Sequence, residues 1–149
     1  MIAAGSPAPE FVLKRADGSD FKRTDLEGKT TILVFYPFAF SPVCTDQFNL
    51  YEEVLSDLHE RGATMYGVSC DATYSQTAFK DHLGVTIEQL SDFEPKGAVC
   101  RAFDAYHRGG FPQRALAIID ADCTVRWSYQ APSPADLPGA NLIFDALDG

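Results

Sequence analysis

The sequence predicts an α/β protein built on one central mixed β-sheet, and two arrangements of short apolar runs carry this prediction. A buried strand at residues 31–36, a helix that begins at Ser41 and a second buried strand at residues 63–69 follow one another. A strand, a crossover helix and a strand form a βαβ unit, whose two strands are parallel. Later, Ala115–Ile119 and residues 124–129 flank a short turn, as the arms of an antiparallel hairpin do. Parallel and antiparallel pairs therefore belong to the same sheet.

Two short segments before the first buried strand are predicted to form an N-terminal β-hairpin. Residues 10–15 and 20–22 are its arms, and Asp17 with Gly18 supplies the turn between them. The apolar run at residues 31–36 follows. It is rich in β-branched and aromatic residues and is short enough to be a buried strand.

The helix after this strand is predicted from the residues at its ends and from the spacing of its apolar residues. Ser41 is a favourable N-cap, and Pro42 suits the first helical position. Gly62 suits the position just after the last turn, so one helix is expected between Ser41 and Gly62. Its apolar stripe has the i, i+3, i+4, i+7 spacing of a helix face, at Tyr51, Val54, Leu55 and Leu58.

Further helices and a weak strand are predicted between and after these units. They are a helix at residues 73–83, a weak strand at 85–90, a helix that starts at Pro95, and a last amphipathic helix after a proline-rich connector at 132–138. Gly84 ends the first of these helices, and Gly109 with Gly110 forms a loop.

A βαβ unit followed by a hairpin and a final helix is the element order of a thioredoxin-like three-layer sandwich. The N-terminal hairpin and an insertion at about residues 73–106 are then additions to that core. We expect residues 1–149 to form a single domain, because this length with 46% hydrophobic residues supports one sizeable core.

Composition and charge exclude several classes of protein. The formal net charge is −9 and no stripe of Lys or Arg occurs, so we expect no nucleic-acid partner. No apolar run approaches the roughly 18 residues that span a bilayer. The first residues lack a basic, apolar leader, so we expect a cytoplasmic protein without a membrane partner. No haem, flavin or nucleotide motif occurs, and we expect no cofactor.

The four cysteines, Cys44, Cys70, Cys100 and Cys123, are spread singly along the chain. Because there is no C-x-x-C pair and no Cys/His cluster, the sequence predicts neither a metal site nor a framework of disulfides. Cys44 differs from the others because it falls in the first turn of a predicted helix. Free backbone N–H groups and the positive end of the helix dipole meet there and favour a reactive thiolate.

Pro37, Ser41 and Cys44 have the spacing P-x-x-x-S-x-x-C, and this motif resembles the active site of the peroxiredoxins. The similarity continues at Arg114, directly before Ala115–Ile119, where that family carries its active-site arginine. It extends over essentially the whole chain. The resemblance implies a thiol-dependent peroxidase, which reduces hydrogen peroxide and organic hydroperoxides through a sulfenic acid on Cys44.

Four residues are expected to carry this chemistry. Cys44 is the nucleophile, and the permanently charged fork of Arg114 stabilises the peroxide oxygens as their bond breaks. A strand antiparallel to residues 31–36 begins beside the end of that strand, which places Arg114 near Cys44. The Ser41 hydroxyl contacts peroxide or sulfur, or only caps the helix, and Pro37 shapes and desolvates the pocket. Three further residues are expected to bind substrate: Phe38, Phe40 and Val43.

Within the family the chain is most similar to the alkyl hydroperoxide reductase E type, and next to the bacterioferritin comigratory protein type. The second type usually has Glu three residues after the reactive Cys and often another Cys five residues after it, where this chain has Gln47 and Asn49. The E type implies a one-Cys route, in which an external thiol or a thioredoxin- or glutaredoxin-like reductant reduces the sulfenic acid. The resemblance also implies a homodimer.

Two alternatives stay open at this point. Cys100, near the start of a predicted helix, is a candidate resolving thiol of a two-Cys enzyme if local unfolding exposes it. In the second alternative, the protein is a non-enzymatic peroxide sensor, and the oxidation of Cys44 is its signal. A thioredoxin-like disulfide oxidoreductase is disfavoured, because residues 44–47 lack the second Cys of a C-x-x-C motif.

Overall fold

The computed structural model describes residues 1–149 and contains a seven-stranded mixed sheet with the strand order β2-β1-β5-β4-β3-β8-β9. β3 pairs in parallel with β4 and antiparallel with β8, which confirms the βαβ unit and the mixed sheet. The N-terminal and C-terminal hairpins are also present. The strands of the sheet are β1 (Val12–Lys14), β2 (Asp20–Lys22), β3 (Thr30–Phe35), β4 (Ala63–Ser69), β5 (Glu88–Ser91), β8 (Ala115–Ile119) and β9 (Val125–Gln130).

Helices flank this sheet, and a separate small hairpin lies outside it. The helices are η1 (Arg23–Leu26), α1 (Pro42–Glu53), α2 (Leu55–Glu60), α3 (Thr73–Leu83), α4 (Ala98–Ala102) and α5 (Ala140–Asp148). The small hairpin pairs β6 (Tyr106–His107) with β7 (Phe111–Pro112) around the predicted Gly-Gly loop, and the sequence analysis missed its two short strands.

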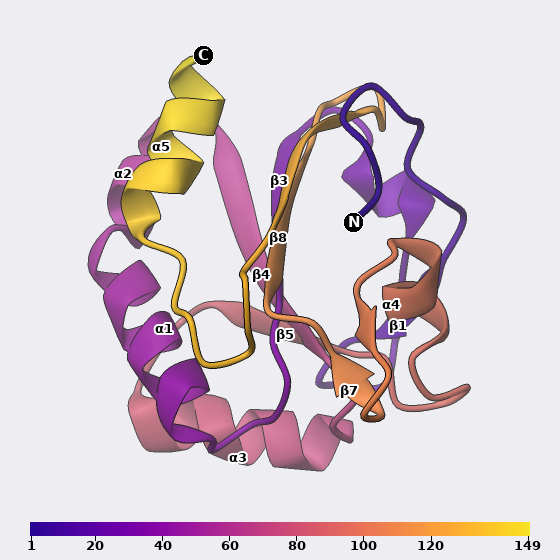
Figure 1. Ribbon diagram of the computed structural model, residues 1–149, viewed down its shortest axis with the longest axis vertical. Coiled ribbons are helices and arrows are strands. Elements are labelled where there is room, and N and C mark those ends of the chain that lie inside the picture. Colours follow the sequence, from indigo (N-terminus) through magenta and orange to yellow (C-terminus); the bar gives the residue numbers. More distant parts are fainter.

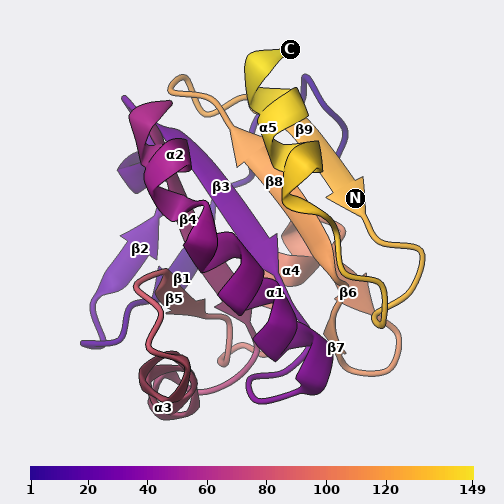
Figure 2. The same cartoon turned by 90° about the vertical axis from the view of Figure 1, so that its left-hand side faces the viewer.

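Successive residues of β3 point to opposite faces of the sheet and enter two separate apolar clusters. Ile32 and Val34 belong to a cluster with residues of α1, α2 and α5, here called the α1-side cluster. Leu33 and Phe35 belong to a cluster with residues of α4 and the N-terminal hairpin, the α4-side cluster. In Figure 1, α1, α2 and α5 lie to the left of the sheet and α4 to its right, and Figure 2 views the left-hand layer face on. The sheet therefore separates two cores.

The prediction of a single helix after Ser41 is wrong, because the helix is interrupted at Val54. The N–H of Val54 donates to the carbonyl of Tyr51, three residues earlier, and the ψ angle of Val54 is 5°. This tightened turn ends α1, and α2 begins at the next residue. Tyr51, Leu55 and Leu58 are nevertheless all buried, so the predicted apolar stripe crosses the interruption and keeps both helices against the sheet.

Two elements of the inserted segment begin later than the sequence predicts. β5 occupies Glu88–Ser91 instead of residues 85–90. The helix expected from Pro95 begins only at Ala98, because Gly97 takes a φ of 73°. This left-handed conformation suits glycine and cannot be continued as a right-handed helix.

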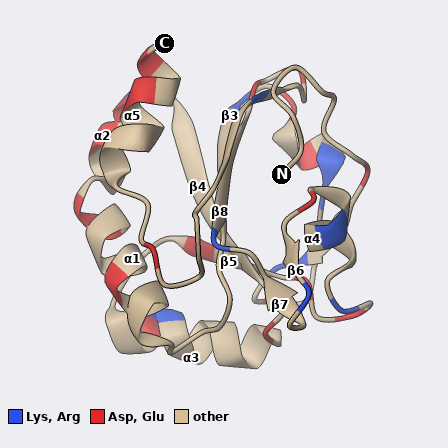
Figure 3. Ribbon diagram, viewed as in Figure 1, with Lys and Arg blue, Asp and Glu red and all other residues tan.

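The layer formed by α1, α2 and α5 is acidic. These three helices contain no Lys or Arg, and they carry Asp46, Glu52, Glu53, Asp57, Glu60, Asp145 and Asp148. Figure 3 shows red segments along these helices, whereas α4 on the other side carries blue. Because like charges repel, this layer disfavours the approach of a polyanion. None of the helices combines the length and the apolar character that crossing a bilayer requires.

Candidate active site

Cys44 lies in the first turn of α1, where the sequence predicts it. Ser41 occupies the N-cap position, Pro42 is the first helical residue and Cys44 is the third. The Cys44 side chain is completely buried within the α1-side cluster. The Ser41 hydroxyl does not cap the helix, because it donates to the Phe38 carbonyl at 2.9 Å instead. Ser41 thus fixes the turn that leads into α1.

Arg114 is the side chain that contacts Cys44. Its Nη2 donates to the Cys44 Sγ at 3.1 Å. Its Nη1 donates to Gln47 Oε1 at 2.6 Å and its Nε to the Pro134 carbonyl at 2.6 Å. Arg114 is only 2% exposed, yet no carboxylate lies within ion-pair distance of it. Among its three acceptors only the Cys44 sulfur can carry a full negative charge, so the guanidinium charge is directed at that sulfur.

The register of the sheet explains how two residues 70 positions apart come into contact. Phe35, the last residue of β3, is paired with Ala115, the first residue of β8. Arg114 therefore stands beside the point at which the chain leaves β3 for the helix that carries Cys44. The expected placement of Arg114 near Cys44 is what the structure shows.

A buried polar chain continues from Arg114 through Gln47 to Tyr51. Gln47 Nε2 donates to the Tyr51 hydroxyl at 3.2 Å, and that hydroxyl donates to the Pro138 carbonyl at 2.7 Å. Burial raises the pKa of Tyr51 to about 12, so its hydroxyl remains a donor at neutral pH. The sequence distinguishes subtypes at Gln47 but does not predict this contact. The available signal was its position three residues after Cys44, on the same side of the helix.

A pocket of about 260 Å³ opens beside Arg114. The ring of Phe38 is 5.2 Å from the ring of Phe111, and both residues line the pocket, which gives it an apolar rim. A small molecule that enters it meets the guanidinium that contacts Cys44. Five of the predicted site residues line this pocket: Pro37, Phe38, Ser41, Val43 and Arg114.

Two predicted residues lie away from this pocket. The ring of Phe40 lies 5.4 Å from that of Phe79 and 5.8 Å from that of His82, over α3. Cys100 is buried in the α4-side cluster, whereas Cys44 belongs to the α1-side cluster on the opposite face of the sheet. The structure thus brings neither Phe40 to the pocket nor Cys100 to Cys44.

Side chains able to hold a metal ion gather in one other place. Cys70, Asp92 and Cys100 have their sulfur and oxygen atoms within 4.8 Å of one another. This group includes none of the residues that line the pocket beside Arg114. The polar groups of the Cys44 site are instead donors and acceptors from Arg114 and Gln47, which suit the binding of a small polar molecule.

A Gln47→Ala variant is expected to slow the reaction of Cys44 with hydrogen peroxide about tenfold and to lower the free energy of unfolding by about 1–3 kcal/mol. The substitution removes the acceptor of Arg114 Nη1 and leaves a buried N–H without a partner. Stopped-flow single turnovers measure the rate, and urea unfolding measures the stability. Asn49→Ala, at an exposed position of the same helix, is the matched control and should change neither. A wild-type rate in Gln47→Ala would contradict a positioning role.

The chain is similar to several known proteins. The AhpC/TSA family matches residues 4–128. A Mycobacterium tuberculosis protein with peroxiredoxin in its name is 35% identical over 105 residues, which cover 70% of this chain and 66% of that protein. The chain thus spans about two thirds of that relative. Alkyl hydroperoxide reductase E of Mycobacterium bovis is 25% identical over 149 residues, which cover 99% of this chain and 97% of that protein.

Solved structures resemble the whole chain. The crystal structure of Enterococcus faecalis AhpC matches with a TM-score of 0.88 and 23% sequence identity, covering 99% of this chain and 92% of that one. This likeness confirms the predicted thioredoxin-like fold, with a mixed central sheet and flanking helices. At this identity the likeness establishes the fold alone.

Proposed function

Because the chain belongs to the AhpC/TSA family of peroxiredoxins, we propose that it is a thiol-dependent peroxidase, an oxidoreductase that reduces hydrogen peroxide and organic hydroperoxides. Cys44 is the proposed nucleophile, with Arg114, Ser41 and Pro37 as its catalytic partners. One observation carries the proposal: the buried Arg114 guanidinium donates to the Cys44 Sγ at 3.1 Å and has no carboxylate partner. An arginine at this depth is ordinarily paired with an acid, so its position beside a thiol favours a chemical role.

The proposed reaction transfers two electrons from sulfur to the peroxide. The Cys44 thiolate attacks one oxygen of the hydroperoxide, an S–O bond forms, and the O–O bond breaks. Cys44 becomes a sulfenic acid. The leaving alkoxide or hydroxide takes a proton and departs as an alcohol or as water.

Arg114 is proposed to stabilise the charge that develops on the leaving oxygen. Of the five N–H donors of an arginine, three are used by Cys44, Gln47 and Pro134. The other two are left for peroxide oxygens, at the place where stabilisation lowers the barrier most. Ser41 lines the same pocket, and its hydroxyl oxygen is proposed to accept the peroxide O–H.

We propose that an external thiol completes the cycle by the one-Cys route. Cys100 and Cys123 are buried in the α4-side cluster, and Cys70 packs against that cluster, so none lies on the Cys44 face of the sheet. A small thiol or a thioredoxin- or glutaredoxin-like protein would reduce the sulfenic acid. Because the Cys44 side chain is completely buried, a protein reductant requires the first turn of α1 to open.

We also propose that the protein is a homodimer in the cytoplasm and that residues 1–149 act as one domain. Phe38, on the rim of the pocket, and Phe40, over α3, are 49% and 51% exposed, which supports an apolar interface that includes both residues. The four free cysteines fit a reducing compartment. A single sheet that contains both β1, near the N-terminus, and β9, near the C-terminus, supports one domain.

Trapping the oxidised cysteine tests the one-Cys route. One equivalent of hydrogen peroxide is added to the full chain with dimedone, and the intact mass and a peptide map are measured. We expect one dimedone adduct, on Cys44, and none on Cys70 or Cys100. Cys123→Ser is the matched control and should give the same adduct. A loss of two hydrogens, with Cys44 mapped to a disulfide, would establish the two-Cys route instead.

A further inference from the structure

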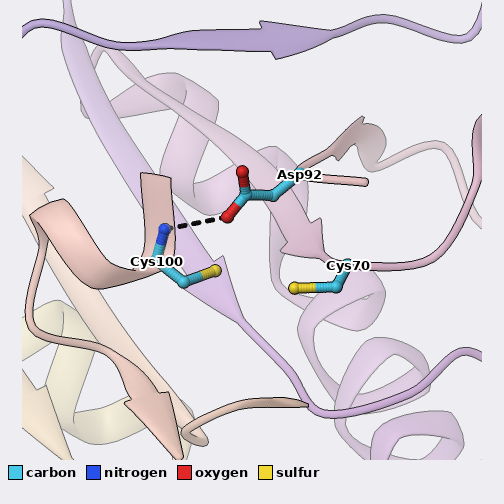
Figure 4. A group of neighbouring side chains, drawn as sticks. All are labelled: Cys70, Asp92 and Cys100. Carbon is cyan, nitrogen blue, oxygen red and sulfur yellow. Dashed lines mark hydrogen bonds between the residues drawn. The ribbon is translucent and has the colours of Figure 1, made fainter. Parts of the chain in front are cut away.

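Cys70 and Cys100 lie next to each other on the face of the sheet opposite Cys44. Cys70 directly follows β4, and Cys100 is in α4. Their sulfur atoms and a carboxylate oxygen of Asp92 all lie within 4.8 Å of one another. Figure 4 shows the two sulfurs pointing toward each other across a short gap. The proposed Cys44 reaction uses neither thiol.

The two thiols differ in their access to solvent. Cys70 is half-buried and lines a pocket of about 320 Å³ whose wall also includes Lys96, whereas Cys100 is completely buried. The neighbouring Cys100 thiol lowers the pKa of Cys70. The neighbouring Cys70 thiol, together with burial, raises the pKa of Cys100. Cys70 is therefore the thiol that a small oxidant reaches, and Cys100 is the protonated neighbour behind it.

Asp92 holds Cys100 in place. Its Oδ2 accepts the N–H of Cys100 at 2.8 Å, and its Oδ1 accepts the N–H of Val99 at 3.1 Å. Burial also raises the pKa of the Asp92 carboxyl. Because both oxygens already bind backbone N–H groups, this carboxyl is a poor third ligand for a metal ion. The arrangement suits a bond between the two sulfurs better than the binding of a metal.

We propose that Cys70 and Cys100 form a second redox site, which hydrogen peroxide converts into a reversible intramolecular disulfide. The Cys70 thiolate attacks one peroxide oxygen, the O–O bond breaks, and Cys70 sulfenic acid and one water result. The Cys100 sulfur then attacks the Cys70 sulfur, an S–S bond forms, and the sulfenic oxygen leaves as a second water with the Cys100 proton. In total the dithiol gives up two electrons and two protons, and one peroxide becomes two waters.

The geometry allows this bond with a small movement. The sulfurs begin within 4.8 Å of each other, and a disulfide requires about 2.05 Å. Cys70 lines a pocket, which leaves its side chain room to move closer to Cys100. Pro37 and Phe38 line both this pocket and the one beside Arg114, so the two pockets are neighbours.

A Cys44→Ser/Cys123→Ser double variant retains only Cys70 and Cys100 and tests the proposal without the Cys44 reaction. The full chain is treated with excess hydrogen peroxide, remaining thiols are blocked with N-ethylmaleimide, and the intact mass is measured. We expect the loss of two hydrogens, no N-ethylmaleimide adduct and a crosslinked peptide that contains Cys70 and Cys100. Dithiothreitol should restore both thiols.

Two further substitutions in this background separate the roles of the two cysteines. Cys70→Ser, at a half-buried position that tolerates the change, should abolish the disulfide and leave Cys100 as an unmodified thiol. Cys100→Ala should leave a Cys70 sulfenic acid that dimedone traps. Circular dichroism checks that each variant is folded. Two free thiols after peroxide treatment, disulfides only between separate molecules, or a bound zinc ion that blocks both thiols would each overturn the proposal.

Discussion

A Cys44→Ser variant is expected to consume hydrogen peroxide on the order of 10³-fold more slowly than the wild type, or worse. A serine hydroxyl is almost fully protonated at neutral pH, and its oxygen cannot form a sulfenic acid. Any remaining reaction would come from the Cys70 and Cys100 pair, which has no buried guanidinium beside it. The measurement is the initial rate of peroxide loss at equal protein concentrations, with dithiothreitol as reductant.

The matched control for this variant is Cys123→Ser. Cys123 lies in the α4-side cluster, far from the pocket beside Arg114, so its replacement should leave the rate unchanged. The fold of Cys44→Ser should also be retained, because serine has a similar shape and its oxygen still accepts from Arg114. Wild-type turnover by folded Cys44→Ser would contradict the assignment of the nucleophile.

An Arg114→Lys variant is expected to reduce the rate constant for the reaction of Cys44 with hydrogen peroxide by about 10²–10³-fold. Lysine keeps the positive charge but lacks the planar fork, so it cannot bind Cys44, Gln47 and Pro134 together. The variant thus separates the contribution of the positive charge to the rate from that of the planar guanidinium. Stopped-flow measurement of a single turnover gives the rate constant without a contribution from the reductant.

Arg126→Lys is the matched control for this second prediction. Arg126 is 36% exposed at its side chain and pairs with Asp120 at the surface, so its replacement should change the rate less than twofold. Arg114→Lys should lower the free energy of unfolding as well, and urea titration identifies conditions in which it is folded. An unchanged rate for Arg114→Lys under those conditions would show that a point charge suffices.

Much of the site follows from patterns that are local in the sequence. The end of the strand near Pro37, the N-cap position of Ser41 and the first-turn position of Cys44 are fixed by neighbouring residues, and the structure shows each where it was predicted. The placement of Arg114 required one non-local step, the antiparallel pairing of β8 with β3. That step was available because both strands are continuous apolar runs that only the centre of a sheet accommodates.

The features that the sequence did not predict depend on contacts between distant segments. One acceptor of Arg114 is the Pro134 carbonyl. The orientation of a backbone carbonyl in a proline-rich connector cannot be predicted from the spacing of residues in the sequence. The proximity of Cys70 and Cys100 depends on where α4 settles against the end of β4. The interruption at Val54 is a small backbone change that the apolar stripe crosses unaltered, so periodicity alone could not reveal it.

The span of 70 residues between Cys44 and Arg114 has a consequence for how the protein acquires its activity while folding. Closing a chain segment of this length costs conformational entropy, and that cost is met only when β8 docks onto β3. Helix α1 can form early from local contacts, but its thiol then lacks the guanidinium beside it. A newly made chain would therefore be a poor peroxidase until its sheet is nearly complete, and the recovery of activity reports the last long-range step of folding.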